Sequence, residues 1–269
     1  MGLSRITLEN FRNHAATTLG ETAHFNLLVG ENGAGKTNLL EALSLLGPGR
    51  GLRRAALGDL ARKALDDAAL PFAIGASLTE AGIVSARIGT HTEPGQPGRR
   101  LVRVNSAAAS AASLAEWLAM SWLTPSMDSL FTDSAGTRRR FMDRMALAIA
   151  PDHARRVGAL EAALRERGKL LEHNGDPRWM DAIEAQAADH GAAVARTRAD
   201  LVLRLMDELS ALPPEPFARP ALTYHPGGPL DETALRADLA RARPRDRAAG
   251  RALIGPQRDE MEVKMASTG

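Results

Sequence analysis

The chain has 269 residues, of which 44% are hydrophobic and only 4% aromatic, so it can bury a core built mainly from Leu, Ala and Val. The absence of cysteine excludes disulfides and thiolate metal sites, and the absence of a signal-peptide core or a membrane-length apolar run favours a cytoplasmic protein without a membrane partner. The net charge is only +2, with four lysines among 34 basic residues and therefore thirty arginines, so total charge gives no argument for a nucleic-acid partner and only clustering would.

The first predicted elements are a short strand over residues 3–8 and a turn over residues 10–13. The apolar run at residues 24–29 predicts a buried strand that leads directly into a glycine-rich loop. A helix is expected after Lys36, and the breaker Gly47-Pro48-Gly49 ends it.

The loop Gly30-Glu31-Asn32-Gly33-Ala34-Gly35-Lys36-Thr37 matches the phosphate-binding pattern G-x-x-x-x-G-K-[ST], and a strand–loop–helix context supports the match. Glycines let consecutive backbone N–H groups face one anion, and the helix N-terminus adds partial positive charge. We expect Lys36 to reach the β- and γ-phosphates of a nucleotide and the Thr37 hydroxyl to bind Mg²⁺. The alternative is a glycine-rich strand-to-helix turn with a surface lysine.

A short helix is predicted over residues 57–66, followed by strands at 70–78, 81–89 and 99–105. The loop at residues 92–98 separates the last two strands, so the three are expected to form an antiparallel meander. Together with the glycine loop they define a predicted α/β nucleotide-binding lobe over residues 1–112.

The pattern from Leu114 onward is helical, with one helix expected to begin near Thr137. Two amphipathic helices between about residues 151 and 210, separated by a break at 174–177, predict an antiparallel coiled-coil-like hairpin within a helical lobe at 113–218. The remaining residues, 219–269, contain a strand near Leu222–Tyr224 and a helix at Glu232–Arg243.

Two arginine clusters could contact phosphates, and each has a structural alternative. Arg138, Arg139, Arg140 and Arg144 could instead pair with Asp133, Asp143 and neighbouring acids, which we favour slightly. DNA contact and a solvated helix face are equally supported for Arg241, Arg243, Arg245 and Arg247. The seven histidines show no ligand spacing, so Mg²⁺ bound with a nucleotide is the only metal expected.

Four motifs occur in an order that resembles the RecF family of bacterial recombination mediators. They are Leu8-Glu9-Asn10-Phe11-Arg12-Asn13, the loop from Val29 to Ala42, Gly136-Thr137-Arg138-Arg139-Arg140-Phe141-Met142-Asp143-Arg144, and Gly255-Pro256-Gln257-Arg258-Asp259. The family usually has His at the position of Gln257. The first motif is shared with Rad50 and SMC heads, whereas the combination with the arginine segment and the late Gly-Pro motif is more specific to RecF.

The resemblance implies a phosphate-loop ABC-type ATPase head with a β-meander and an inserted helical hairpin arm. It implies an ATP- and Mg²⁺-dependent DNA-binding protein of replication, recombinational repair and the SOS response to DNA damage, which forms a homodimer around two nucleotides. Its DNA partners would be gaps or single-strand/double-strand junctions, and its protein partners RecO and RecR, which help to load RecA. By the same resemblance Asn38 belongs to the nucleotide loop, and Arg12 and Asn13 would approach the nucleotide; the alternative for Arg12 is that it caps the first strand pair.

The chain departs from the family pattern in its hydrolytic residues. No apolar strand ending in Asp-Glu is present, and Asp66-Asp67 is a poor substitute because it follows a helical context. The run Ala266-Ser267-Thr268-Gly269 looks like the start of the family's signature loop, so we expect a truncated sequence in which residues 219–269 are an incomplete return to the head. No catalytic residue is identified.

Three functions are therefore compared. The first is an ATP-gated DNA-binding repair protein of the RecF type, and the second is another SMC- or Rad50-like head, whose arm would be far longer than the roughly sixty residues here. The third is a fragment that binds ATP without hydrolysing it.

Overall fold

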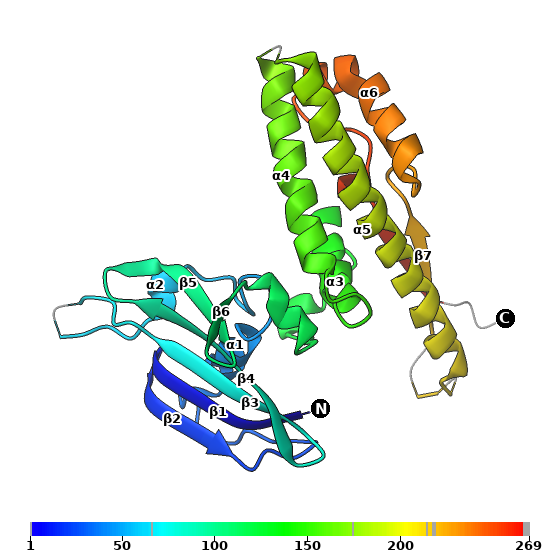
Figure 1. The fold of residues 1–269 in the computed structure, drawn as a ribbon. Coiled ribbons are helices and arrows are strands. Elements are labelled where there is room, and N and C mark those ends of the chain that lie inside the picture. Colours follow the sequence, from blue (N-terminus) through cyan, green and yellow to red (C-terminus); the bar gives the residue numbers. More distant parts are fainter. Residues whose placement is uncertain (1, 66, 174, 214, 217–218, 266–269) are drawn as a thin grey trace. The chain divides into compact units, whose positions relative to one another are not determined.

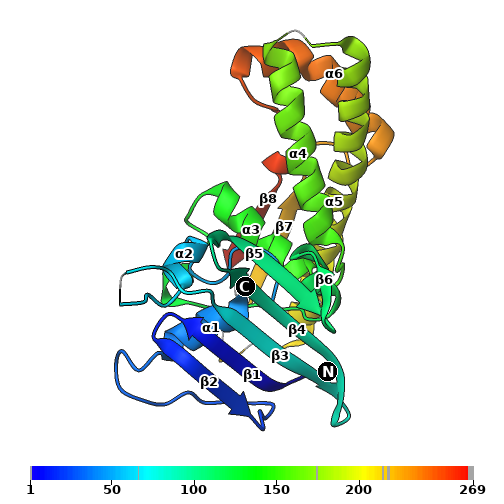
Figure 2. The same ribbon diagram turned by 60° about the vertical axis from the view of Figure 1, so that its left-hand side comes forward.

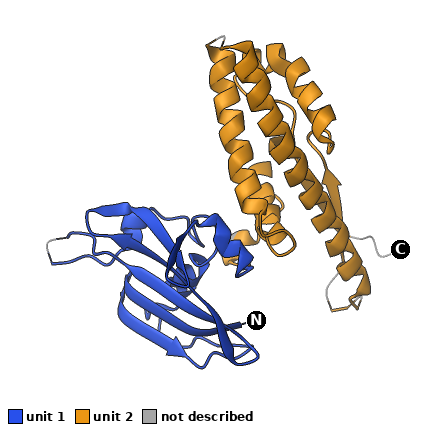
Figure 3. Ribbon diagram, in the orientation of Figure 1, with its two compact units in different colours: residues 1–120 blue, residues 121–269 orange. Residues whose placement is uncertain are grey.

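The computed structural model describes residues 2–65, 67–173, 175–213, 215–216 and 219–265. The chain divides into two compact units, residues 1–120 and 121–269, shown in different colours in Figure 3. The predicted division at 112/113 and 218/219 stays a prediction. Asp66, judged above a poor substitute for the missing Asp-Glu pair, and the expected signature-loop residues Ala266–Gly269 lie outside the described residues.

The first unit is built on a six-stranded antiparallel sheet, which Figures 1 and 2 show from two directions. Its strands are β1 (Gly2–Phe11), β2 (His14–Gly20), β3 (Ala73–Glu80), β4 (Ile83–Glu93), β5 (Gln96–Val104) and β6 (Ala107–Ala109). They lie side by side in the order β2-β1-β3-β4-β5-β6. The predicted first strand and the meander are therefore confirmed, whereas β2, which lacks an apolar alternation, was not predicted.

One face of this sheet carries the core of the first unit. Alternate residues of the central strands, such as Ile6, Ile74 and Ile88, are at most 4% exposed and belong to one apolar cluster with Leu39 and Ala42 of helix α1 (Lys36–Ser44). Since successive side chains of a strand point to opposite faces, the residues between them turn away from this core. The predicted helix after the glycine loop is thus confirmed, and it packs against the sheet.

The strand predicted over residues 24–29 is wrong. This segment has no regular secondary structure, and within the described residues no strand pairs with it. Phe25, Leu27 and Val29 are 87%, 88% and 83% exposed. An apolar run predicts burial but does not supply the neighbouring strand that its backbone N–H and C=O groups need.

Two helical predictions were also too long. The predicted helix at 57–66 is only the single turn α2 (Leu57–Leu60), because residues 61 and 63 form isolated bridges with Phe11 and Ala69 instead. The helical pattern from Leu114 yields the 3₁₀ turns η1 (Ala112–Glu116) and η2 (Pro125–Met127). Pro125, at the first position of η2, favours such a restart over a continuous helix.

The second unit contains the predicted helical hairpin. Helices α4 (His153–Glu172) and α5 (Pro177–Ala211) follow α3 (Ala135–Ala146), and α6 (Glu232–Ala249) packs alongside them, as Figure 1 shows. Apolar side chains such as Leu160, Ala188 and Leu239 form the shared core of α4, α5 and α6. Strand β7 (Pro220–His225) pairs antiparallel with β8 (Glu260–Met265), and the 3₁₀ turn η3 (Pro256–Arg258) precedes β8. No helix in the described residues is both long and apolar enough to span a membrane.

Candidate nucleotide-binding site

The glycine loop lies at the surface of the first unit, directly before helix α1. Its residues Glu31, Asn32, Gly33 and Ala34 are exposed, as is Thr37 in the first turn of the helix. The Lys36 Nζ donates 2.7 Å hydrogen bonds to the carbonyls of Gly30 and Glu31, so its ammonium folds back over the loop. A lysine in this position can exchange those carbonyls for phosphate oxygens without leaving the loop.

Helix α1 has no side chain capping its N-terminus. Its N-cap residue is Gly35, which makes no side-chain cap and adopts a left-handed conformation with φ of 99°. By contrast, Ser134, Asp176 and Asp231 cap α3, α5 and α6 with side-chain oxygens, whereas α4, like α1, has no side-chain cap. Backbone N–H groups at the start of α1 are therefore available to an anion, and the residues present fit a nucleotide phosphate.

The turn between β1 and β2 holds the last glycine of the loop. A Cβ on Gly35 would lie 2.7 Å from the Asn13 Nδ2 and 2.8 Å from the His14 Nε2, so these side chains would have to move, and the φ of 99° favours glycine in any case. The His14 Nε2 lies 3.3 Å from the Gly35 carbonyl oxygen, which can only accept, so this nitrogen carries the hydrogen. The Asn38 Nδ2 donates to the Asn13 Oδ1 at 2.8 Å. The structure thus brings the predicted residues Asn13, Gly35 and Asn38 together.

Arg12 is held by a buried acid in α1. Its Nε and Nη2 donate to the two carboxylate oxygens of Glu41 at 3.0 and 3.1 Å, and its Nη1 donates to the Asp59 carbonyl at 2.8 Å. Glu41 is 2% exposed and also pairs with Arg53, whose Nη1 reaches the Asn38 Oδ1 at 3.1 Å. The Arg12 guanidinium therefore joins the turn, α1 and α2, and its approach to a nucleotide stays a prediction.

His14, Glu41 and Arg53 are site residues that the motif search did not single out. The burial of Glu41 could have been predicted from the sequence, because an acid within the apolar run Leu39–Leu46 needs a cationic partner once it is buried. The roles of His14 and Arg53 could not have been predicted from the sequence, since their contacts depend on how separate segments meet.

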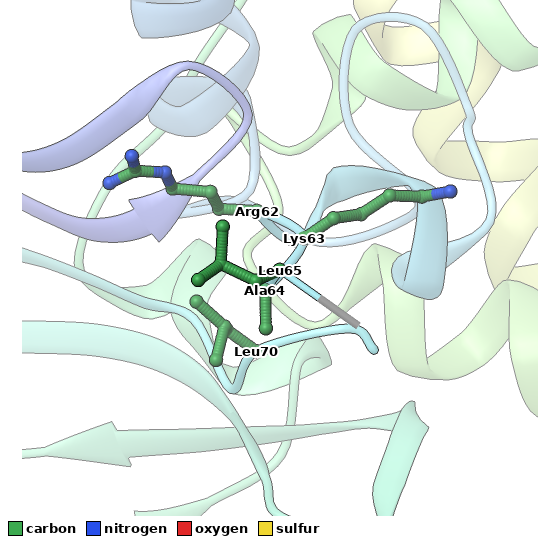
Figure 4. A pocket seen from close by; sticks show the side chains of 5 residues that line it. All are labelled: Arg62, Lys63, Ala64, Leu65 and Leu70. Atoms are coloured by element: carbon green, nitrogen blue, oxygen red, sulfur yellow. The ribbon is translucent and has the colours of Figure 1, made fainter. Parts of the chain in front are cut away.

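A pocket of about 550 Å³ lies elsewhere in the first unit. Its walls are Arg62, Lys63, Ala64, Leu65 and Leu70, and Figure 4 shows the two cationic side chains pointing in opposite directions. None of the residues predicted to bind the nucleotide lines it. No group of three or more His, Asp or Glu residues that could hold a metal is found in the described part of the chain, and Thr37 as a ligand of Mg²⁺ stays a prediction.

The first arginine cluster mostly bonds with other parts of the second unit. Arg138 donates to both carboxylate oxygens of Glu260 at 2.6 and 2.8 Å, and Arg139 donates to the Asp259 carbonyl at 2.9 Å. The Arg144 guanidinium lies 4.2 Å from the centre of the Trp122 ring. The favoured alternative, pairing with acidic residues, is thus confirmed for Arg138, although its carboxylate partner is Glu260 rather than Asp133 or Asp143.

The second cluster is engaged in a similar way. Arg243 pairs with Glu184 and Asp181, Arg241 pairs with Asp238, and the Arg247 Nε donates to the Leu171 carbonyl at 2.8 Å. Arg245 is exposed. Two of the four arginines, Arg243 and Arg247, therefore hold α6 to its neighbours, whereas Arg241 pairs within α6 and Arg245 is exposed.

A buried network joins the arginine motif to the late Gly-Pro motif. Arg198 of α5 donates to Asp143 at 2.8 and 3.0 Å and to Asp259 at 2.9 Å, and the Tyr224 hydroxyl donates to Asp259 at 2.6 Å. Burial by itself would raise the pKa of Asp143, but the hydrogen bond from His153 and the Arg198 charge outweigh it and lower that pKa. Burial, and then the Asp259 charge, raise the pKa of Tyr224, so the hydroxyl stays a donor at neutral pH.

Known proteins resemble the chain along almost its whole length. The family described as RecF/RecN/SMC N terminal domain matches residues 2–212. A protein of Mesorhizobium japonicum named DNA replication and repair protein RecF is 46% identical over 97% of this chain and 72% of its own length. The proteins of that name from Brucella suis biovar 1 and Rhizobium etli are 45% and 42% identical, over 98% and 100% of this chain and 71% and 76% of their own lengths.

Solved structures give the same fold. Two structures described as the recombination mediator protein RecF, one with ATP and one with ATPrS, match with a TM-score of 0.83 over 98% of this chain and 73% of theirs. Because their sequence identity to this chain is only 20–21%, the structural match establishes the fold alone, which is that of an α/β ABC-type ATPase head. Together with the curated relatives and the order of motifs along the sequence, the matches show that this chain belongs to the RecF family.

Proposed function

We propose that the chain binds ATP with Mg²⁺ at Gly30–Asn38 and acts on DNA in replication and recombinational repair. This proposal rests mainly on the start of helix α1. Its N-terminus has no side-chain cap, and the Lys36 ammonium lies over the glycine loop that directly precedes it. Relatives named for DNA replication and repair, and RecF structures described with ATP, support both halves of the proposal.

The finer features of this function follow the family resemblance. The DNA substrate is a gap or a single-strand/double-strand junction, the protein partners are RecO and RecR, and ATP brings two copies together in the cytoplasm. Within the site, Lys36 binds the β- and γ-phosphates, Thr37 and the phosphates hold Mg²⁺, and the backbone N–H groups of the loop surround the phosphate oxygens. Arg12 and Asn13 border the site from the β1–β2 turn.

The test is the Lys36→Ala variant. We expect ATP affinity, measured by calorimetry with Mg²⁺ present, to fall by at least about tenfold, because the cation that faces the phosphates is gone. Lys63→Ala is the matched control, since Lys63 is exposed and its ion-pair partner among the described residues is Asp67. Equal ATP affinity in all three proteins would contradict the assignment of the loop.

DNA binding is tested on the same proteins. The unaltered chain should bind DNA more tightly with ATP and Mg²⁺ than without, and Lys36→Ala should lose that difference. DNA affinity that is identical with and without ATP would argue against coupling between nucleotide and DNA.

A second candidate is ATP binding without turnover. It is favoured by the environment of Glu41, whose two oxygens are occupied by Arg12 and which therefore offers no free carboxylate to activate water. No strand ending in Asp-Glu is found among the described residues. Phosphate release by this chain that disappears in Lys36→Ala would rule this candidate out.

A further inference from the structure

The face of the six-stranded sheet opposite the core presents three exposed arginines. Arg5 lies on β1, Arg87 on β4 and Arg103 on β5, each at a position that alternates with core residues. In the described part of the chain, none of the three guanidinium groups makes an ion pair or a hydrogen bond. This differs from Arg12, Arg138 and Arg198, whose charges are all balanced by carboxylates.

The strand register places these arginines in one group. Arg5 is opposite Ser77, and Ser77 is opposite Arg87. Gly89, two residues after Arg87, is opposite Arg103, so Arg103 lies diagonally across from Arg87. With strands about 4.8 Å apart, the backbones at Arg5 and Arg87 are separated by about 10 Å and Arg103 lies one strand further.

The residues between the three arginines are small and mostly polar. Thr7, Gly75 and Gly89 form a row across β1, β3 and β4, and Ser77 lies in the next row. A Cβ on Gly75 would lie 2.8 Å from the Thr7 Oγ1, so a larger residue would require the Thr7 side chain to turn, and glycine leaves the backbone uncovered here. Hydroxyl groups and bare backbone between cations suit a ligand that must come close to the sheet.

The charge of this face is not compensated by nearby acids. Glu9 lies on this face of β1, two rows from Arg5, Glu93 lies on it at the end of β4, and Glu21 follows the end of β2; among the described residues none of these acids forms an ion pair. Like charges gathered on one sheet face cost stability unless an anion binds between them. The group therefore has the properties of an anion-binding surface, whereas isolated exposed arginines would need no explanation.

We propose that the Arg5–Arg87–Arg103 face binds the phosphate backbone of double-stranded DNA. Guanidinium groups bind phosphate oxygens in pairs, and contacts spaced across three strands suit an extended polyanion better than a single phosphate ion. The strands provide no Phe, Tyr or Trp on this face, so they offer no platform for stacking unpaired bases, which favours duplex over single-stranded DNA. The inference rests on the proposed DNA-binding function and locates its surface.

The experiment compares three triple variants of the full chain by fluorescence anisotropy with a labelled duplex, over a range of salt concentrations. The test variant carries Arg5→Ala, Arg87→Ala and Arg103→Ala, and a second variant changes the same three residues to Lys. The control carries Arg178→Ala, Arg236→Ala and Arg251→Ala, which removes the same charge from exposed positions of the second unit. Circular dichroism confirms that each variant is folded.

Loss of three phosphate contacts should reduce the slope of log affinity against log salt by about 2 to 3 and weaken duplex binding about tenfold or more near 0.1 M salt. The lysine variant should keep most of the slope because it keeps the charge, and single-stranded DNA should respond less than duplex in the test variant.

A test variant that keeps the affinity and slope of the unaltered chain, or loses no more than the control, would overturn the assignment of this face. In that case DNA binding by the unaltered chain would still support the proposed function. Absence of duplex binding by the unaltered chain, with and without ATP, would overturn both.

Discussion

At the scale of single residues, the first unit depends on a carboxylate placed where water hardly reaches. Glu41 is 2% exposed, yet it is charged, and the bidentate contact from Arg12 makes that charge tolerable. The same carboxylate receives Arg53, which in turn touches Asn38 at the start of α1. One acid therefore determines the positions of two arginines beside the glycine loop.

We expect Glu41→Gln to lower the free energy of unfolding by about 1–3 kcal/mol, because an amide cannot balance Arg12 and turns an NH₂ donor toward a guanidinium that is itself only a donor. Urea unfolding at neutral pH measures this. Glu80→Gln, at the exposed end of β3, is the matched control and should change the value by less than about 0.5 kcal/mol. Equal effects of the two substitutions would mean that Glu41 is not a structural ion-pair partner.

At the scale of elements, charged side chains join segments far apart in the second unit. Arg138 of α3 reaches Glu260 of β8, 122 residues later, and Arg198 of α5 bridges Asp143 of α3 and Asp259 beside η3. His153 also donates to the Asp143 carboxylate at 2.8 Å. Asp143 of α3 thus contacts both helices of the hairpin, α4 through His153 and α5 through Arg198.

The acid dependence of stability should reveal this network. The pKa of Asp143 is lowered in the folded state, so its contribution is complete above its unfolded pKa of about 4 and is lost as the pH falls through the folded value. We expect Asp143→Asn to cost about 2–4 kcal/mol at pH 7 and clearly less at about pH 3, which is below the unfolded pKa, so that protonation of the unfolded chain has already removed part of the aspartate's contribution. Chemical unfolding at the two pH values tests this, with the exposed Asp207→Asn as control; a cost independent of pH would contradict it.

These contacts mark the limit of prediction from sequence. The glycine loop, α1 and the α4–α5 hairpin follow from local patterns of glycine, helix periodicity and breakers, so they were predictable. The partner of Arg138 and the role of Glu41 depend on which distant segments meet, and neither spacing nor composition encodes that in one sequence. The apolar run at 24–29 shows the converse, because its composition predicted a buried strand while Phe25 and Leu27 are exposed and unpaired in the described residues.

At the scale of the whole molecule, the chain consists of two compact units that meet in sequence at residues 120 and 121. The segment that follows has only short turns until α3 begins at Ala135, and Leu123 within it is 85% exposed. Irregular, exposed backbone of this kind is where proteases cut folded proteins.

Brief digestion with chymotrypsin should therefore cleave near Trp122 and Leu123 and leave two resistant fragments. A second early cut is expected near Phe25 and Leu27, which are exposed and outside regular structure. Trypsin is the control, because residues 104–137 contain no lysine or arginine and the boundary should survive it. Mass spectrometry identifies the cuts, and a first chymotryptic cut inside α4 or α5 would contradict the division into two units.

The position of β1 within its sheet has a consequence for synthesis on the ribosome. This strand can pair with β2 as soon as both are synthesised, but its other edge pairs with β3. Leu8 therefore has no partner on that edge until Ile74 is synthesised, and Gly2 has none until Thr79. The glycine loop and α1 emerge during that interval, before the sheet against which α1 packs is complete. The nascent chain therefore carries an open, pairing-competent strand edge for dozens of codons, which is the period when chaperones or a neighbouring nascent copy would compete for it.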